Sequence, residues 1–253
     1  GLNLHLDRNN KIYLYGYNDF ANSYMPEEII FEEIDLATGK LTNKKALKFT
    51  NPIFPEKLSY SEKLKAKKED FREVKDKNKY GNRIYVYQTN MDEYYFILQQ
   101  HYFIRDPEGM HTYAFDNIFV HYYNKSTSKE WEVLFPMGTM YSIKEYGGFL
   151  PMMFNNKFHL IFNDCSQNAE KTGNQDIVES KIKPTDCTHT TFIASFDNNG
   201  FLKRETLDNA KYALFYLKPS YNYLNKELFI GYSLNKETER NKREIGIMKI
   251  TSK

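Results

Sequence analysis

The sequence predicts an all-β protein made of consecutive four-stranded antiparallel sheets, and three observations lead to this prediction. Tyr and Phe are abundant, with 21 and 19 copies in 253 residues, and both residue types favour strands. Short apolar runs end at Asn, Asp or Gly, which supply tight turns. Four such runs follow one another between Phe149 and Leu207. Four consecutive antiparallel strands form one blade of a β-propeller, so this segment predicts a blade.

Variants of the same unit can be placed before and after this segment, and each strand is a short run rich in aromatic and β-branched residues. In the first one, Leu2, Leu4 and Leu6 alternate with polar residues, as in a half-buried strand. In chain order, strands are expected at 2–6, 11–17, 29–34, 45–49, 83–87, 93–103, 116–123, 130–135, 149–154, 157–164, 187–196, 201–207, 212–217, 226–232 and 244–250.

These strands predict one propeller-like domain over residues 1–253, with about four blades. The last unit lacks a fourth strand. We therefore expect either part of a larger propeller, or a last blade completed by an additional segment or a second chain. The expected blades span approximately 1–50, 81–136, 141–208 and 211–252.

A charged insertion at 56–79 interrupts the repeated pattern. Within it, a three- and four-residue spacing that allows one short amphipathic helix connects Tyr60, Leu64, Lys67, Phe71 and Val74. Two interpretations remain, a solvated insertion between blades and a binding helix, and the first is the more common fate of such charge runs.

Composition argues against a nucleic-acid partner and against membrane insertion. The 35 basic and 33 acidic residues give a formal charge of only +2, so no global field attracts a polyanion. No stretch approaches the ~18 consecutive apolar residues of a membrane helix. The chain begins at Gly1 without the pattern of a signal peptide, and we expect a trimmed start.

The order of several strand and turn segments resembles a group of uncharacterised exported proteins of Bacteroidetes that look like β-propellers. The likeness covers most of the chain, and its segments are structural patterns rather than catalytic motifs. The resemblance implies a propeller-like fold and export to the periplasm or cell surface, and it supplies no known activity. It rests on residues 94–103, 116–120, 130–135, 157–164 and 195–207.

Cys165 and Cys187 are the only cysteines. Cys165 ends a predicted strand that runs from Phe158, and Cys187 starts the next strand. Antiparallel pairing would bring them to the mouth of a loop, and an exported context favours a disulfide. Two buried thiols are an alternative. A zinc site with Asp164 and His189 is a further one, although the spacing of structural zinc ligands is missing.

Acidic residues near strand ends are the candidates for catalysis. Carboxylate pairs that hydrolyse glycans lie about 5 to 10 Å apart, which a sequence cannot measure. Charged strand ends are more often simply solvated. The weak candidates for the face around a propeller axis are Asp92, Glu93, Asp116, Asp164, Asp186 and His189.

Cofactor and metal motifs are absent from the sequence. The six histidines form no metal-binding motif, and Gly147–Gly148 reads as a turn that enters a strand rather than as a phosphate loop. The oxygen-rich segments 35–39 and 197–200 suggest either ordinary turns or calcium sites, and they lack the further ligands of a calcium loop. We expect no cofactor.

Function is the least determined property. We expect a non-enzymatic interaction or scaffold module that binds a protein or glycan through loops at Gln167–Thr185 and Pro107–Thr112. The alternative is a glycan hydrolase or lyase that uses carboxylates at the propeller axis. A third hypothesis is a structural part of a cell-envelope assembly, attached through an unpaired edge strand.

Overall fold

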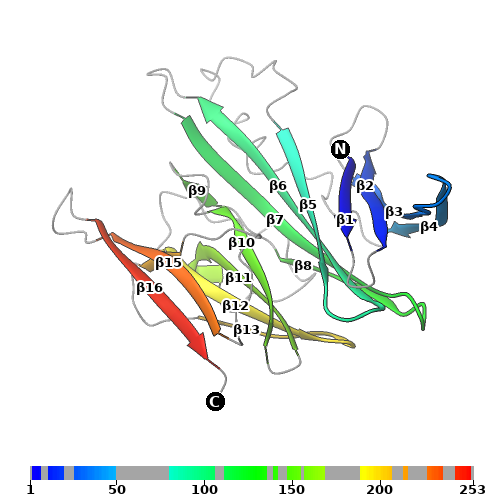
Figure 1. The fold of residues 1–253 in the computed structure, drawn as a ribbon. Coiled ribbons are helices and arrows are strands. Elements are labelled where there is room, and N and C mark those ends of the chain that lie inside the picture. The colour runs from blue at the N-terminus through cyan, green and yellow to red at the C-terminus, as the bar shows by residue number, and fades with distance from the viewer. Residues whose placement is uncertain are drawn as a thin grey trace. The chain divides into compact units, whose positions relative to one another are not determined.

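In the computed structural model, every regular element among the described residues is a β-strand, apart from one 3-10 helix of three residues (Figure 1). The all-β prediction is therefore confirmed. The charged insertion at 56–79 lies outside the described residues. The structure describes residues 2–6, 11–19, 26–49, 80–105, 111–135, 139–141, 147–154, 157–168, 189–206, 213–215, 227–235 and 243–251.

The first sheet contains four antiparallel strands in chain order. Side chains alternate between the two faces of this sheet. One face carries the buried residues Tyr13, Tyr15 and Phe31, and the other carries the partly exposed Ile12 and Leu14. Its strands are β1 (Leu2–Leu6), β2 (Ile12–Asp19), β3 (Pro26–Ile34) and β4 (Leu41–Lys48).

The second sheet also follows chain order and has an additional short strand. Strands β6 and β7 are longer than predicted, with 13 and 14 residues. The N-terminal part of β7 pairs with β9, a strand that was not predicted, and Phe115 opposite Thr139 is one of the pairs. Its strands are β5 (Tyr80–Gln88), β6 (Glu93–Arg105), β7 (His111–Asn124), β8 (Glu130–Phe135) and β9 (Thr139–Tyr141).

The third sheet contains the segment in which the sequence pattern was clearest. Its strands β10 (Phe149–Phe154), β11 (Lys157–Cys165), β12 (His189–Asp197) and β13 (Gly200–Thr206) are antiparallel and in chain order. The 3-10 helix η3 (Ser166–Asn168) follows β11 directly. Strand β12 is described from His189, which is opposite Cys165 at the end of β11, and its predicted start at Cys187 lies outside the described residues.

The fourth sheet has three described strands, again in chain order. The long pair β15 and β16 is in register from Glu227 opposite Thr251 to Asn235 opposite Arg243. The strands are β14 (Ala213–Phe215), β15 (Glu227–Asn235) and β16 (Arg243–Thr251).

The chain divides into two compact units. Unit 1 comprises residues 1–99 and 119–134, and unit 2 comprises residues 100–118 and 135–253. Strands β6 and β7 therefore contribute residues to both units. The first sheet lies in unit 1, and the third and fourth sheets lie in unit 2.

Aromatic rings form the core of unit 1, where the first sheet contacts the second. The rings of Tyr13 and Phe31 stack with their centroids 4.5 Å apart. Phe31 also contacts Tyr94 and Phe96 of β6, at centroid distances of 5.0 and 5.3 Å. All four side chains are buried, so this contact belongs to the core of unit 1.

The core of unit 2 is likewise aromatic. Phe135, at the end of β8, contacts Phe162 of β11, Phe196 of β12 and Phe201 of β13, at centroid distances of 5.8, 5.7 and 5.3 Å. Phe158 packs on Phe196 at 5.6 Å. The Phe residues that are abundant in the sequence thus pack together in the core of this unit.

Candidate functional site

Asp164 is the centre of a buried polar cluster in unit 2. It lies on β11, and both it and its ion-pair partner Arg204 have fully buried side chains. The Nη2 of Arg204 donates a hydrogen bond to Oδ2 of Asp164 at 2.7 Å. Asn168 of η3 donates its Nδ2 to both carboxylate oxygens, at 3.1 and 3.0 Å. The carboxylate therefore has the cation and the hydrogen bonds that a buried charge requires.

Arg204 reaches Asp164 from β13 and lies against two aromatic rings. Its Cζ lies 3.9 Å from the ring centroid of Phe192 and 4.9 Å from that of Phe162. Burial lowers the pKa of the guanidinium, and Asp164 opposes that shift. The Nε and Nη1 atoms of Arg204 have no hydrogen-bond partner in the described part of the chain, so the rings are major contacts of this cation.

The register of the third sheet explains how these groups meet. Asp164 and Phe162 are two residues apart on β11, so both point to one face of the sheet, and Phe192 of β12 is directly opposite Phe162. Arg204 is opposite Ala194, which has a small side chain. The Arg204 side chain can therefore cross β12 above Ala194 and reach Asp164.

His159 and Ser195 form a second buried polar pair in unit 2. The two residues are opposite each other on β11 and β12, and Nδ1 of His159 lies 2.9 Å from Oγ of Ser195. The Nε2 of His159 lies 3.1 Å from the carbonyl oxygen of Phe154, so Nε2 must carry the proton and Nδ1 accepts from the hydroxyl. Burial lowers the pKa of His159. Because both side chains are buried, we interpret the pair as a structural hydrogen bond.

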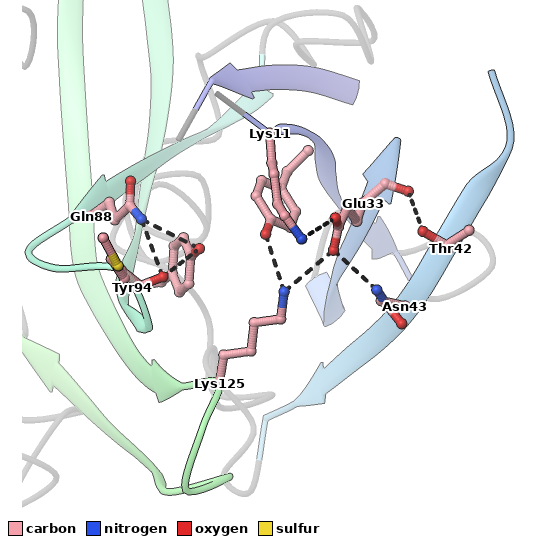
Figure 2. A network of polar contacts seen from close by, with 9 residues as sticks. Lys11, Glu33, Thr42, Asn43, Gln88, Tyr94 and Lys125 are labelled. Carbon is pink, nitrogen blue, oxygen red and sulfur yellow. Dashed lines mark hydrogen bonds and ion pairs between the residues drawn. The ribbon is translucent and has the colours of Figure 1, made fainter. Parts of the chain in front are cut away.

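Glu33 of β3 is the centre of a polar cluster in unit 1 (Figure 2). Lys11 lies 2.6 Å from its Oε1, and Lys125 lies 3.3 Å from its Oε2. Asn43 donates to Oε2 at 3.0 Å, and the Nζ of Lys125 also contacts the hydroxyl of Tyr13 at 3.2 Å. The pKa of Glu33 is lowered to about 2, chiefly by the hydrogen bond from Lys11. Lys125 follows β7, so the cluster ties the second sheet to the first inside unit 1.

His121 of β7 is a buried base in unit 1, only 3% exposed. Glu130 and Glu132 of β8 lie 3.7 and 3.8 Å from its two ring nitrogens, too far for hydrogen bonds. Neither nitrogen has a hydrogen-bond partner among the described residues. Burial, with a smaller effect from Lys45, lowers the pKa of His121 to about 4. The ring is therefore neutral at pH 7.

The predicted candidates Asp92 and Glu93 lie together at the β5–β6 turn of unit 1. The backbone carbonyl of Asp92 accepts a hydrogen bond from the N–H of Lys125 at 2.7 Å. Thr89 donates to Oε2 of Glu93 at 3.0 Å, and the hydroxyl of Tyr122 donates to Oε1 at 3.0 Å. Glu93 is thus hydrogen-bonded both to the β5–β6 turn and to β7.

The other predicted site residues belong to unit 2. Asp116 lies on β7, and His189 begins β12 directly opposite Cys165. The side chains of Asp116 and His189 lie outside what the structure describes, as do Asp186 and Cys187. Cys165 is described and fully buried at the end of β11. The disulfide between Cys165 and Cys187 stays a prediction.

The two oxygen-rich segments are turns, as one interpretation of the sequence predicted. Oδ1 of Asp35 accepts hydrogen bonds from the N–H groups of Ala37 and Thr38 at 2.8 and 3.2 Å, and Gly39 has a φ of 67°. Oδ1 of Asp197 accepts hydrogen bonds from the N–H groups of Asn199 and Gly200, at 2.7 and 3.1 Å. Both carboxylates are therefore used to close hairpins.

Within the described parts of the chain, no group of three or more His, Cys, Asp or Glu side chains is arranged to hold a metal ion. No helix among these residues is long and apolar enough to cross a membrane. Protein-family models and curated proteins were both compared with the chain, and neither comparison found a match.

Sequence reasoning missed Arg204 and Asn168. Arg204 stands in the run Lys203-Arg204-Glu205, which reads as a solvated strand. Lys203 and Glu205 are indeed exposed, and only the middle residue turns inward. Period-2 alternation was the available signal, because it places Arg204 on the same face as Phe162 and Phe192 once the register is known. Asn168 had no such signal, since η3 was not predicted.

Proposed function

We propose that this protein is a non-enzymatic interaction or scaffold module, and that it binds a protein or glycan partner through the predicted loop at 167–185. The observation that carries the proposal is the buried Asp164–Arg204–Asn168 cluster. It fixes η3, where this loop begins, to two strands of the third sheet. Binding residues often lie on loops that a rigid scaffold positions.

Two further features support a loop anchored at its base. The connection between β11 and β12 spans residues 166–188 and joins two neighbouring antiparallel strands. Cys165 ends the first of these strands, and a disulfide to Cys187 would close the same loop by a covalent bond. A loop with a fixed base loses less conformational entropy when it binds a partner.

The state of the described carboxylates favours binding over glycan hydrolysis. Asp164 is paired with Arg204, Glu33 with Lys11 and Lys125, and Glu93 accepts from Thr89 and Tyr122. A general acid of a glycosidase needs access to substrate. Asp164 and Glu33 instead have cations beside them and are buried.

The propeller arrangement and the exported location are part of this proposal. Support for blades comes from the four sheets, whose main paths follow chain order, and from the antiparallel pairing of neighbouring strands in the first, third and fourth sheets. Support for export, and for a relation to the Bacteroidetes group, comes only from the resemblance of the strand and turn patterns. In a propeller, the loop at 167–185 would lie on one face of the ring.

The experiment compares the native protein with a variant in which residues 170–184 are replaced by a short Gly-Ser linker. Both are applied to a glycan array and to immobilised cell-envelope proteins. We expect the variant to lose at least about tenfold in affinity for the ligands of the native protein, which corresponds to about 1.4 kcal/mol. A Lys203→Ser variant, altered on the exposed side of β13, should bind like the native protein.

Equal binding by the native and loop-replaced proteins would overturn the proposal. Release of new reducing ends from any glycan by the native protein would instead support the hydrolase alternative. Near-ultraviolet circular dichroism on each variant checks that the sheet core is retained.

A further inference from the structure

The hairpin between β12 and β13 contains the one Asn-Gly pair of the sequence, Asn199 followed by Gly200. Asn199 is exposed in the turn of this hairpin. In such a pair the backbone nitrogen of the glycine can attack the side-chain carbonyl carbon of the asparagine, because the two atoms are close in the chain and close a succinimide ring. Asparagine is one of the heat-labile residue types. The pair is therefore a candidate for modification by its own chain.

The backbone of this hairpin requires a glycine directly after Asn199. Gly200 has a φ of 138°, a conformation that residues with a side chain rarely adopt. It begins β13 and is opposite Asp197, the last residue of β12, so the hairpin closes between these two residues. The reactive pair is thus tied to the tight turn, because a larger residue at position 200 would strain it.

The attacking nitrogen of Gly200 is open to approach. No side chain of its own covers it, and among the described residues beyond its chain neighbours no heavy atom lies within 4 Å of the place of a Cβ. Asn90, which is also exposed in a hairpin turn, precedes Met91 instead. Its Oδ1 accepts hydrogen bonds from the N–H groups of Asp92 and Glu93, both at 3.0 Å. Asn90 is therefore an internal control that lacks the glycine.

Asp197 holds the nitrogen that would attack. Its Oδ1 accepts hydrogen bonds from the N–H of Gly200 at 3.1 Å and from the N–H of Asn199 at 2.7 Å. The nitrogen of Gly200 must lose its proton during the reaction, and a carboxylate that accepts this N–H stabilises the protonated form. The bond to Asp197 must therefore break before the ring can close.

We propose that Asn199 is a site of self-modification, and that the hydrogen bond from Gly200 to Asp197 sets its rate. The nitrogen of Gly200 forms a bond to Cγ of Asn199 while the bond from Cγ to Nδ2 breaks. The side-chain amide nitrogen takes up the proton that Gly200 releases and leaves as ammonia. Water then hydrolyses the succinimide at either carbonyl and gives aspartate or isoaspartate. The inference does not depend on the loop-binding function.

The products change the hairpin in which they form. Both add a carboxylate to the turn, beside that of Asp197, and like charges repel. In isoaspartate the main chain also runs through the former side chain and is longer by a methylene group. The ladder of β13 begins at Gly200 and places Arg204 opposite Ala194. We therefore expect the modified protein to unfold at a lower temperature than the unmodified one.

The experiment incubates the full chain under mildly alkaline conditions. Mass spectrometry of its peptides follows the conversion of each amide into an acid, and an isoaspartyl methyltransferase with S-adenosylmethionine detects isoaspartate. Asn199 should convert at least about tenfold faster than Asn90 in the same sample. Asp197→Ala should raise the rate at Asn199 roughly tenfold, as expected from the loss of one hydrogen bond to a charged group. Asp197→Asn keeps an acceptor oxygen and should stay near the native rate.

Asn199→Ser is the variant that removes the reaction. It should form no isoaspartate in this peptide, and its unfolding temperature should stay constant during an incubation that lowers that of the native protein. Three results would overturn the proposal. They are a conversion of Asn199 no faster than that of Asn90, a rate that Asp197→Ala does not raise, and aspartate formed without isoaspartate, which indicates direct hydrolysis. Circular dichroism of each variant before incubation verifies the fold.

Discussion

At the scale of single residues, we expect Arg204 and Asp164 to contribute to the stability of the third sheet as a buried pair. Removing one partner leaves a buried charge without its counter-ion, which typically costs about 3 to 5 kcal/mol. We expect Asp164→Asn and Arg204→Met each to lower the free energy of unfolding in urea by that amount. The double variant should lose less than the sum of the two.

The neighbouring pair Lys203–Glu205 supplies the control for this experiment. Nζ of Lys203 lies 2.7 Å from Oε2 of Glu205, but both side chains are more than half exposed. Exposed pairs contribute about 0 to 1 kcal/mol, so Lys203→Met should have little effect. Additive losses at Asp164 and Arg204 would contradict the coupling.

His121 should make the stability of unit 1 depend on pH. Its pKa in the folded state, about 4, is below the value of 6.5 expected in the unfolded chain. Between these values the unfolded chain binds more protons, so the stabilisation is complete above pH 6.5 and is lost as the pH falls toward 4. The loss from this group is about 3 kcal/mol.

The variant His121→Phe isolates this effect. The groups that face His121 are Lys45 of β4 and Glu130 and Glu132 of β8, and they remain in place. Urea unfolding at several pH values should therefore give a shallower decline for the variant than for the native protein between pH 6.5 and 4. Parallel curves would show that His121 does not titrate on unfolding.

At the scale of elements, Gly147 allows a close approach that the sequence did not reveal. We interpreted Gly147–Gly148 as a turn entering a strand. In the structure a Cβ atom at Gly147 would overlap the ring of Phe115 on β7. Gly147→Ala should therefore destabilise the protein by about 1 to 3 kcal/mol, as overpacking does.

A double-mutant cycle distinguishes this overlap from a backbone effect. Phe115→Leu should reduce the cost of Gly147→Ala, which thermal unfolding would detect as a coupling energy. Gly39→Ala is the control, because Gly39 has a φ of 67° and no atom near its missing side chain. Its cost should not change when Phe115 is replaced.

The connection from β11 to β12 carries the disulfide prediction. If Cys165 and Cys187 are bonded, thiol titration of the unfolded, unreduced protein finds no free thiol, and reduction releases two. Cys187→Ser should then lower the free energy of unfolding by roughly 3 kcal/mol, as expected for a loop of this length. Two titratable thiols before reduction would contradict the disulfide.

The elements that sequence reasoning predicted correctly are those with local causes. Asp35 and Asp197 close hairpins through their own neighbouring N–H groups, and a turn of this kind is written in a few residues. Strand β9 depends instead on pairing with β7, which lies far away in the sequence. Local residue patterns contain little information about such pairing.

The candidate site likewise combines features with local causes and features that depend on how distant strands pair. Period-2 alternation identified the strands that carry Asp164 and Arg204, but the ion pair depends on the register of three strands. The orientation of the first sheet is similar. Leu4 and Leu6 predicted a half-buried strand, and only the contact of Tyr13 with Tyr94 shows which face is the core.

At the scale of the whole molecule, strands β6 and β7 link the folding of the two units. Each strand has residues in both units, so we expect that unfolding one unit disrupts strands to which the other unit also contributes. We therefore expect one cooperative transition in differential scanning calorimetry, with equal calorimetric and van't Hoff enthalpies. Phe31→Leu in unit 1 and Phe158→Leu in unit 2 should each move this single transition to lower temperature. Two transitions, of which each variant moves only one, would show that the units unfold independently despite their shared strands.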